Sequence, residues 1–181
     1  WLDRLPFDIY SVNVHTGAKR LIGRSYRTAP KWSVNGKWAV MYDPIAQVWN
    51  KFDGATGKVV NISDAIGYPM FMESYDKPAP APAYGIAGWT ADGNNVFLYD
   101  AYDWWKTDLT GERQPECLTK GYGRKHGKSI RKMTSNIDKD VFQKDEKVIV
   151  SLWDKDTMDE GVYQLDMKGR LRKLMEGNYV Y

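Results

Sequence analysis

The residues best suited to do chemistry are scattered singly along this 181-residue sequence. A long proline-rich stretch carries Glu73, Tyr75 and Asp76, whose carboxylates and phenol could bind a ligand. Long loops on a rigid scaffold are where binding residues collect. We therefore predict these three side chains as candidate substrate-binding residues. The alternative is a loop that only packs between neighbouring elements.

The sequence lacks the patterns that nucleophilic catalysis or metal binding would need. Its one cysteine, Cys117, is remote in sequence from His15 and His126, and His15 precedes a Thr-Gly turn as an exposed hairpin residue would. No serine has glycines two positions before and two positions after it, so the Gly-x-Ser-x-Gly nucleophile elbow is missing. We predict no catalytic residue, no cofactor and no metal site in this chain.

Three charged or glycine-containing stretches have simpler interpretations. Residues 127–129 read Gly-Lys-Ser, but Tyr122 stands where a phosphate-binding loop needs its first glycine. Residues 154–161 are acidic like a calcium loop, yet Met158 replaces a required ligand, so we interpret them as a polar hairpin tip. The basic stretch 120–132 has no accompanying nucleic-acid-binding signature, and we predict a solvated loop with no nucleic-acid partner.

Composition favours a globular all-β protein. The 26 basic and 23 acidic residues nearly balance, to a net charge of +3, and 43% of residues are apolar. Eight tryptophans and twelve tyrosines favour strands, whose pleated surface suits large aromatic side chains. No apolar run is long enough to span a membrane. The chain starts with Trp1 and shows no signal sequence, so we expect it to be part of a longer protein.

The elements that must position these residues follow from an internal repeat. Residues 30–43 contain Trp-Ser-Val-Asn-Gly-Lys and then an apolar run that ends in Tyr-Asp. Residues 88–100 repeat the pattern in register, as Trp-Thr-Ala-Asp-Gly-Asn and another apolar run that ends in Tyr-Asp. Asn-Gly and Asp-Gly supply tight turns between strands. Each copy therefore predicts two strands joined by a turn.

A second hairpin, with a glycine at its tip, follows each copy. Four such hairpins occur, with their tips at Gly17, Gly57, Gly111 and Gly169. A four-stranded antiparallel unit that recurs every 40 to 60 residues or so is typical of a propeller blade. We therefore predict an all-β partial β-propeller of about three and a half four-stranded antiparallel blades.

The predicted divisions lie within one domain, residues 1–181. They are half a blade (5–25), a blade (30–63), a proline-rich inter-blade loop (64–84), a blade (85–120), a basic linker with one short edge strand around Ile130 (121–139), and a blade (140–176). We interpret five tryptophans as residues that pack the blades together rather than as a sugar-stacking platform. They are Trp32, Trp38, Trp89, Trp104 and Trp105.

The repeated Trp-Ser-Val-Asn-Gly-Lys pattern resembles the TolB-like propeller repeat. Several further stretches are similar to the propellers of prolyl oligopeptidase family serine peptidases, which include dipeptidyl and acylaminoacyl peptidases. They are residues 61–63, 72–78, 84–90, 98–105 and 118–121. The resemblance covers about residues 5–176, and its motifs are structural rather than catalytic.

This resemblance implies a non-catalytic domain that gates or positions a peptide substrate. The partner would be a C-terminal α/β-hydrolase domain outside this chain, in a periplasmic or extracellular protein. The paired glutamates with which dipeptidyl peptidases hold a peptide amino terminus are absent, and Glu73 stands alone in its loop. One alternative is a stand-alone TolB-like interaction module. Another is a sugar-binding propeller, which would need paired carboxylates at the central channel.

A partial propeller has unpaired edges and exposed faces at its two ends. We therefore also predict that two chains pair through those ends.

Overall fold

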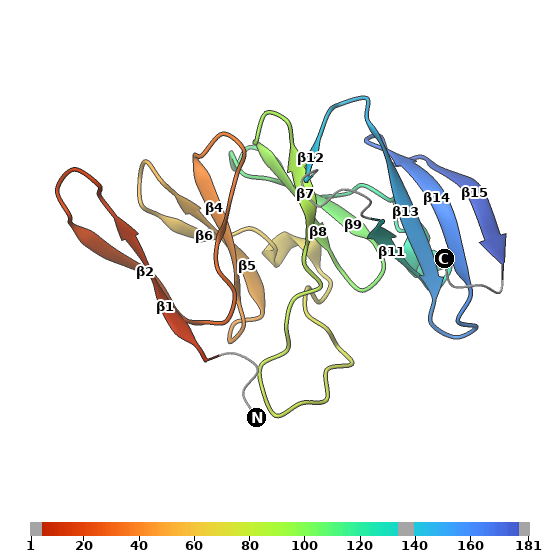
Figure 1. The fold of residues 1–181 in the computed structure, drawn as a ribbon, viewed down its shortest axis with the longest axis horizontal. Helices are drawn as coiled ribbons and strands as arrows, with labels where there is room; N and C mark the ends of the chain where they lie inside the picture. Colours follow the sequence, from red (N-terminus) through yellow and green to blue (C-terminus); the bar gives the residue numbers. More distant parts are fainter. Residues whose placement is uncertain (1–4, 134–139, 178–181) are drawn as a thin grey trace.

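The computed structural model describes residues 5–133 and 140–177 as a fan of β-sheets (Figure 1). The first sheet has two antiparallel strands, β1 (Phe7–Val12) and β2 (Lys19–Tyr26). The second sheet has the order β3-β4-β5-β6, and these strands are β3 (Lys31–Trp32), β4 (Trp38–Asp43), β5 (Val48–Asp53) and β6 (Val59–Asn61). A 3-10 helix, η1 (Asp64–Ile66), follows it.

The third and fourth sheets complete the fan. The third contains β7 (Ile86–Thr90), β8 (Asn95–Tyr99), β9 (Trp104–Asp108), β10 (Glu116–Cys117) and, beside β7, the short parallel strand β12 (Val141–Phe142). The helix α1 (Tyr122–Lys125) leads to the fourth sheet, which has the order β11 (Lys128–Lys132), β13 (Lys147–Asp154), β14 (Glu160–Asp166) and β15 (Leu171–Gly177). The described chain is thus an all-β partial propeller of about three and a half blades, and the predicted fold class is confirmed.

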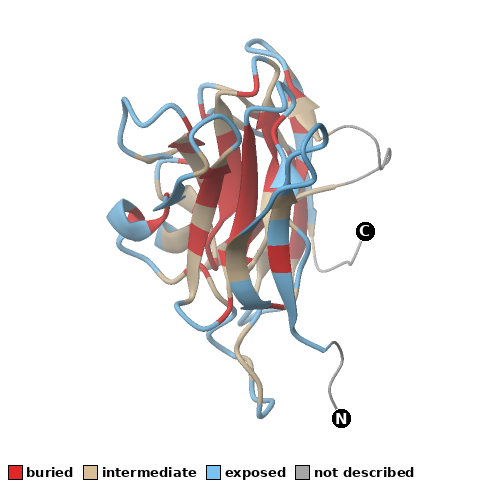
Figure 2. Ribbon diagram, turned by 90° about the vertical axis from the view of Figure 1, so that its left-hand side faces the viewer, coloured by how far each residue is buried: buried red, intermediate tan, exposed pale blue. Residues whose placement is uncertain are grey.

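The middle strands bury both faces, because successive side chains of a strand point to opposite sides. In β4, Ala39 and Met41 pack toward the first sheet, whereas Val40 and Tyr42 pack toward the third. In β8, Val96 and Leu98 join the same cluster as Val40, and Phe97 and Tyr99 face the fourth sheet. The buried strands lie inside the stack and the exposed residues along its rim and loops (Figure 2). The repeated apolar runs are therefore the interior of the propeller.

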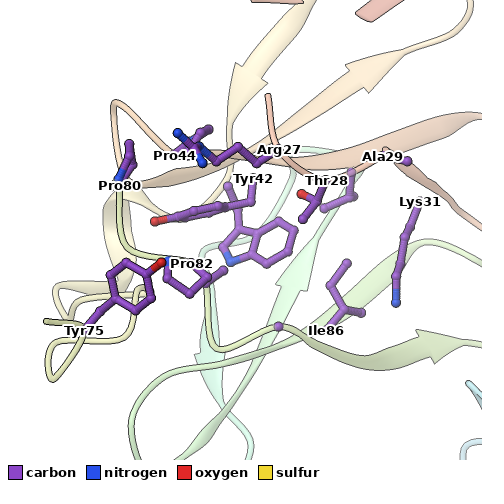
Figure 3. A pocket seen from close by; sticks show the side chains of 14 residues that line it. Arg27, Thr28, Ala29, Lys31, Tyr42, Pro44, Tyr75, Pro80, Pro82 and Ile86 are labelled. Atoms are coloured by element: carbon purple, nitrogen blue, oxygen red, sulfur yellow. The ribbon is translucent and has the colours of Figure 1, made fainter. Parts of the chain in front are cut away.

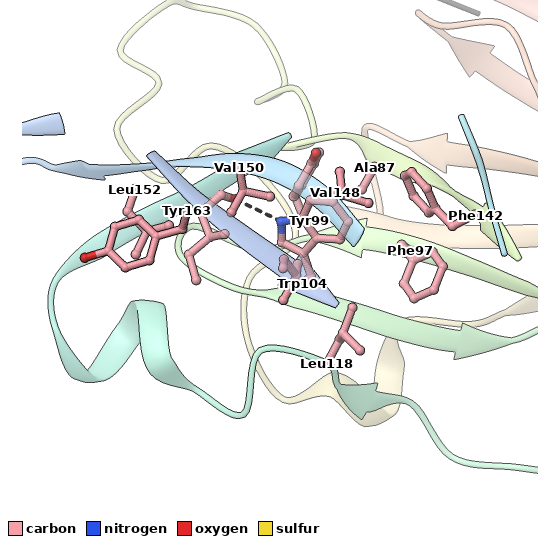
Figure 4. Close-up of a cluster of buried hydrophobic side chains, with 12 residues drawn as sticks. Ala87, Phe97, Tyr99, Trp104, Leu118, Phe142, Val148, Val150, Leu152 and Tyr163 are labelled. Atoms are coloured by element: carbon pink, nitrogen blue, oxygen red, sulfur yellow. Dashed lines mark hydrogen bonds between the residues drawn. The ribbon is translucent and has the colours of Figure 1, made fainter. Parts of the chain in front are cut away.

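Aromatic side chains fill the space between the third and fourth sheets. Trp104 is fully buried, its ring centroid lies 5.3 Å from that of Tyr99 and 6.1 Å from that of Phe142, and its indole N–H donates to the Ile130 carbonyl at 3.1 Å (Figure 4). Aromatic pairs contribute about 0.5–1.5 kcal/mol beyond the area they bury. This cluster holds the last blade against its neighbour.

The two copies of the turn motif contact each other. The Ser33 hydroxyl donates to Asn35 Oδ1 (2.8 Å), and the Thr90 hydroxyl donates to Asp92 Oδ1 (2.6 Å). Each hydroxyl also accepts the N–H that opens the next strand. The Asn35 amide donates to the Asp92 carbonyl at 2.9 Å, and a side chain at Gly93 would collide with Asn35. The spacing of the repeat therefore places the turns of adjacent blades side by side.

Strand pairing corrects the expected make-up of the last blade. The short edge strand predicted around Ile130 is β11, which pairs with β13 and so belongs to the fourth sheet rather than to a linker. The residues expected to begin the last blade instead form β12, which joins the third sheet. The Trp89 N–H donates to the Asp140 carbonyl at 2.7 Å, and the missing side chain of Gly88 leaves room for this approach. Residues 134–139 of the predicted linker lie outside the described residues.

One predicted packing residue is exposed. Trp38, Trp89 and Trp104 are buried, but the side chain of Trp32 is 55% exposed. Trp89 packs against the neighbouring four-stranded sheet, whereas the sheet beside Trp32 has only two described strands. The same position in the repeat is thus buried only where a complete blade precedes it.

Candidate functional site

A cavity of about 380 Å³ lies between the second and third sheets, under the proline-rich loop (Figure 3). Tyr42 and Trp49 form one wall from β4 and β5. The loop contributes Tyr75 and Pro82. Ile86, at the start of β7, closes the side toward the third sheet. Pockets of 300–1,000 Å³ with mostly apolar walls are typical small-ligand sites.

Short-range pairing gives the loop its shape. The Met72 N–H donates to the Pro82 carbonyl (2.8 Å), and the Tyr84 N–H donates to the Met70 carbonyl (3.1 Å). Its prolines lack an N–H, so they cannot extend this pairing into a sheet. The buried hydroxyl of Tyr42 donates to the Ala81 carbonyl at 3.1 Å and attaches the loop to the second blade. The loop is thus a fixed wall of the cavity.

The charged side chains on the cavity wall are cationic. Arg27 and Lys31 line it, and within residues 5–133 and 140–177 no aspartate or glutamate does. Lys31 lies at the same end as Ile86, while Tyr75 lies at the opposite end (Figure 3). Burial, reinforced by the Asp43 carboxylate, raises the pKa of Tyr42 to about 12, so this phenol stays neutral and can donate. The cavity therefore suits an anionic or acceptor-rich ligand.

Trp49 has a polar group without a partner. Its side chain is 6% exposed, and the buried indole N–H has no acceptor among the described residues. Most buried donors in proteins are paired, and an unpaired one costs about 1–3 kcal/mol. The ring packs on Tyr42 with centroids 5.4 Å apart, and both rings line the cavity. An unpaired hydrogen-bond donor thus belongs to a residue that lines the cavity.

The structure brings one of the three predicted site residues to this cavity. Tyr75 is half-buried and lines it. Glu73 and Asp76 are exposed and do not line it. The backbone N–H of Glu73 donates to the Tyr84 hydroxyl at 3.3 Å, which is a loop contact. A binding role for the three residues remains a prediction.

Sequence reasoning missed most of the cavity. Tyr42 belongs to the repeated apolar run, Trp49 to the hairpin that follows it, and Lys31 to the short strand before the Asn-Gly turn, and none of these patterns indicates a cavity. The cavity forms where these segments meet loop residues that lie 26 or more positions further along the chain. The only sequence signal was the loop itself, whose prolines forbid a strand and whose length exceeds a blade connection.

The cysteine and the histidines lie in separate structural contexts. The Cys117 thiol, whose pKa is raised mainly by burial, accepts the Gly121 N–H at 3.2 Å. The His126 ring packs on Tyr122 at a centroid distance of 4.3 Å. The His15 N–H donates to Asn13 Oδ1 in the first hairpin. These contacts are structural.

The basic stretch is engaged in internal contacts. Arg124 pairs with the buried carboxylate of Asp100 at 2.8 Å and lies over the Tyr68 ring. Arg131 donates to the Asp100 carbonyl, and burial lowers its pKa. Lys128 and Lys132 also form ion pairs, with Glu176 and Asp140. Arg131 and Lys132, both on β11, thus tie the fourth sheet to the third. Lys128 joins two strands within the fourth sheet.

The acidic stretch that begins at Asp154 is a hairpin tip. Asp154 Oδ1 accepts the backbone N–H groups of Thr157 and Asp156, which lowers the pKa of Asp154. Over residues 5–133 and 140–177, no group of three or more His, Cys, Asp and Glu side chains could hold a metal ion. Within the same ranges, no helix is long and apolar enough to cross a membrane.

The fold and the cavity define this chain as a partial β-propeller with a cavity of ligand size between two blades. Among solved structures, the crystal structure of TolB from Acinetobacter baumannii is similar to it, with 14% sequence identity and a TM-score of 0.43 over 94% of this chain and 48% of that chain. The chain spans about half the length of that TolB chain. No protein-family model and no curated protein matches the sequence.

Proposed function

We propose that this chain is a propeller-type binding module that holds peptides at the cavity between its second and third blades. The observation that carries the proposal is a cavity of about 380 Å³ with aromatic and prolyl walls and an unsatisfied donor on one wall residue. Rigid aromatic and prolyl walls suit the side chains of a peptide, and its backbone carbonyls suit the donor.

A finer proposal concerns the role of the bound peptide. We propose that the module gates or positions peptides for a hydrolase domain outside these residues, in a periplasmic or extracellular serine peptidase. This proposal rests on the sequence motifs that resemble prolyl oligopeptidase family propellers. The rival, a stand-alone interaction module, would bind the peptide without any attached catalytic domain. The end sheets of the propeller are exposed, since Tyr10 on β1 and Met175 on β15 are about half exposed. Such faces suit contact with another domain or with a second copy of the chain.

Peptide binding can be tested directly. A mixture of unstructured four- to six-residue peptides should be retained by the protein in equilibrium dialysis with mass-spectrometric detection. A variant with Tyr75→Ala should retain less, because it removes one wall of the cavity. A matched control with Tyr10→Ala changes an exposed tyrosine far along the chain, on β1, and should retain as much as the wild type. Retention by neither wild type nor control would end the binding proposal.

The peptidase proposal has a separate test. The open reading frame should continue past Tyr181 for about 250 residues and encode Gly-x-Ser-x-Gly, and the full protein should react with a fluorophosphonate serine probe. A frame that stops shortly after Tyr181 would leave the stand-alone module.

The predicted pairing of two chains is tested by light scattering. Association that increases with concentration supports pairing through the end sheets, and a monomer at high concentration contradicts it.

A further inference from the structure

We infer that the cavity recognises the free C-terminal carboxylate of a peptide whose last side chain is apolar. The inference rests on the proposed function, because it names which end of a peptide the cavity holds. Three independent features of the cavity carry it: its charge, its apolar walls and its unsatisfied donor.

The first feature is the one-sided charge of the lining. Lys31 lines the cavity from β3 and Arg27 lines it from the segment before β3, and no carboxylate is found among the described lining residues. Asp43, the nearest acid in sequence to the wall residue Tyr42, accepts the N–H groups of Ile45 and Ala46 in its own turn. An anion entering the cavity is therefore attracted by cations and meets no acidic side chain on the walls.

The second feature is the extent of the apolar wall. Tyr42, Pro82 and Ile86 contribute rings and an alkyl chain from three different segments of the fold. Such a surface takes an aliphatic or aromatic side chain, which gains about 25 cal/mol for each Å² removed from water. Because Lys31 lies at the Ile86 end, the carboxylate and the side chain of one terminal residue can bind side by side (Figure 3).

The third feature is the Trp49 indole N–H, which is buried and lacks an acceptor among the described residues. A peptide carbonyl or a carboxylate oxygen supplies that acceptor once binding uncovers the nitrogen, which is buried in the free protein. A positively charged amino terminus supplies none and would be repelled by Lys31. The chemistry of the cavity thus favours the carboxyl end of a peptide over its amino end.

The test compares two probes that differ only at the charged group, N-acetyl-L-phenylalanine and its C-terminal amide. Protein labelled with ¹⁵N at tryptophan reports on each indole N–H, and Trp49→Phe identifies the Trp49 signal by its loss. We expect this signal to move saturably with the carboxylate probe, and the amide to bind about three- to tenfold more weakly, as expected for one partly exposed ion pair.

Matched lysine variants test the charge. Lys31→Gln should weaken the carboxylate probe to the level of the amide, and Lys58→Gln, which changes an exposed lysine outside the cavity, should bind like the wild type. Equal binding of both probes, or full carboxylate binding by Lys31→Gln, would overturn the C-terminal inference but leave peptide binding intact. No movement of the Trp49 signal with either probe at millimolar concentration would overturn both. The probe comparison itself is made on the wild-type protein, so it stands even where Lys31→Gln fails to fold, and Trp49→Phe serves only to assign the signal.

Discussion

The tip of the last hairpin presses on the preceding blade, and a single methyl group tests that contact. Gly169 has a φ of 81°, and a Cβ at this position would lie 1.8 Å from the Leu118 carbonyl oxygen. Gly17 occupies the equivalent tip of the first hairpin with a φ of 72°, and a Cβ there would meet nothing within 4 Å. Both glycines have a positive φ, but only Gly169 has a neighbouring atom in the place where a Cβ would lie.

Replacement of each glycine by alanine separates the cost of the left-handed backbone from the cost of the collision with Leu118. Both variants place a non-glycine residue in the left-handed region, which costs about 1–2 kcal/mol. Gly169→Ala must also displace the backbone at Leu118, whose side chain belongs to the buried cluster between the third and fourth sheets. Overpacking of this kind costs about 1–3 kcal/mol more. We therefore expect Gly169→Ala to lose about 2 kcal/mol more unfolding free energy than Gly17→Ala.

Urea unfolding followed by tryptophan fluorescence and by far-ultraviolet circular dichroism measures both losses. Coincident transitions from the two probes would support a two-state comparison. Equal losses for the two variants would refute the reasoning, because they would mean that the Gly169 tip does not press on the third blade. A larger loss for Gly17→Ala would refute it as well.

Three other changes test the packing and the electrostatics. Leu98→Ala should lose about 2–5 kcal/mol of unfolding free energy in the same urea assay, because Leu98 is fully buried between the second and third sheets. The control Ile45→Ala changes a 70% exposed position and should stay within about 0.5 kcal/mol of the wild type. Asp103→Ala should lose about 3 kcal/mol or more of unfolding free energy, because the buried carboxylate accepts three hydrogen bonds around α1. Asp103→Asn should lose less because its amide keeps one acceptor oxygen, and equal losses for the two variants would contradict this reasoning. Hydrogen bonds from lysines, Lys128 first, lower the pKa of Glu176 from 4.5 to about 2, so its stabilisation is present above pH 4.5 and is lost as the pH falls toward 2. Glu176→Gln should accordingly lower stability at pH 7 and reduce the loss between pH 4.5 and 2, and an unchanged acid titration of stability would contradict the assignment.

Local chemistry made the fold class predictable. The Asn-Gly and Asp-Gly turns, the glycine hairpin tips and the apolar runs all act between neighbours in the chain, and the structure forms its hairpins at these places. The recurrence of these signals then indicated blades, because a four-stranded unit cannot bury both faces without a neighbour. Tyr75 could be anticipated for a similar reason, since its proline-rich loop cannot join a sheet.

The sequence by itself thus determined most of the strands, the hairpins of the second and third sheets and the repeating order of the blades. Only the tertiary structure decided that β12 pairs with β7, that Trp32 is exposed while Trp89 is buried, and that Lys31, Trp49, Tyr75 and Ile86 line one cavity. The physical reason is the separation along the chain of the residues that interact. Turn geometry and alternation depend on residues a few positions apart, whereas the cavity depends on how segments from two blades and a loop pack together in space.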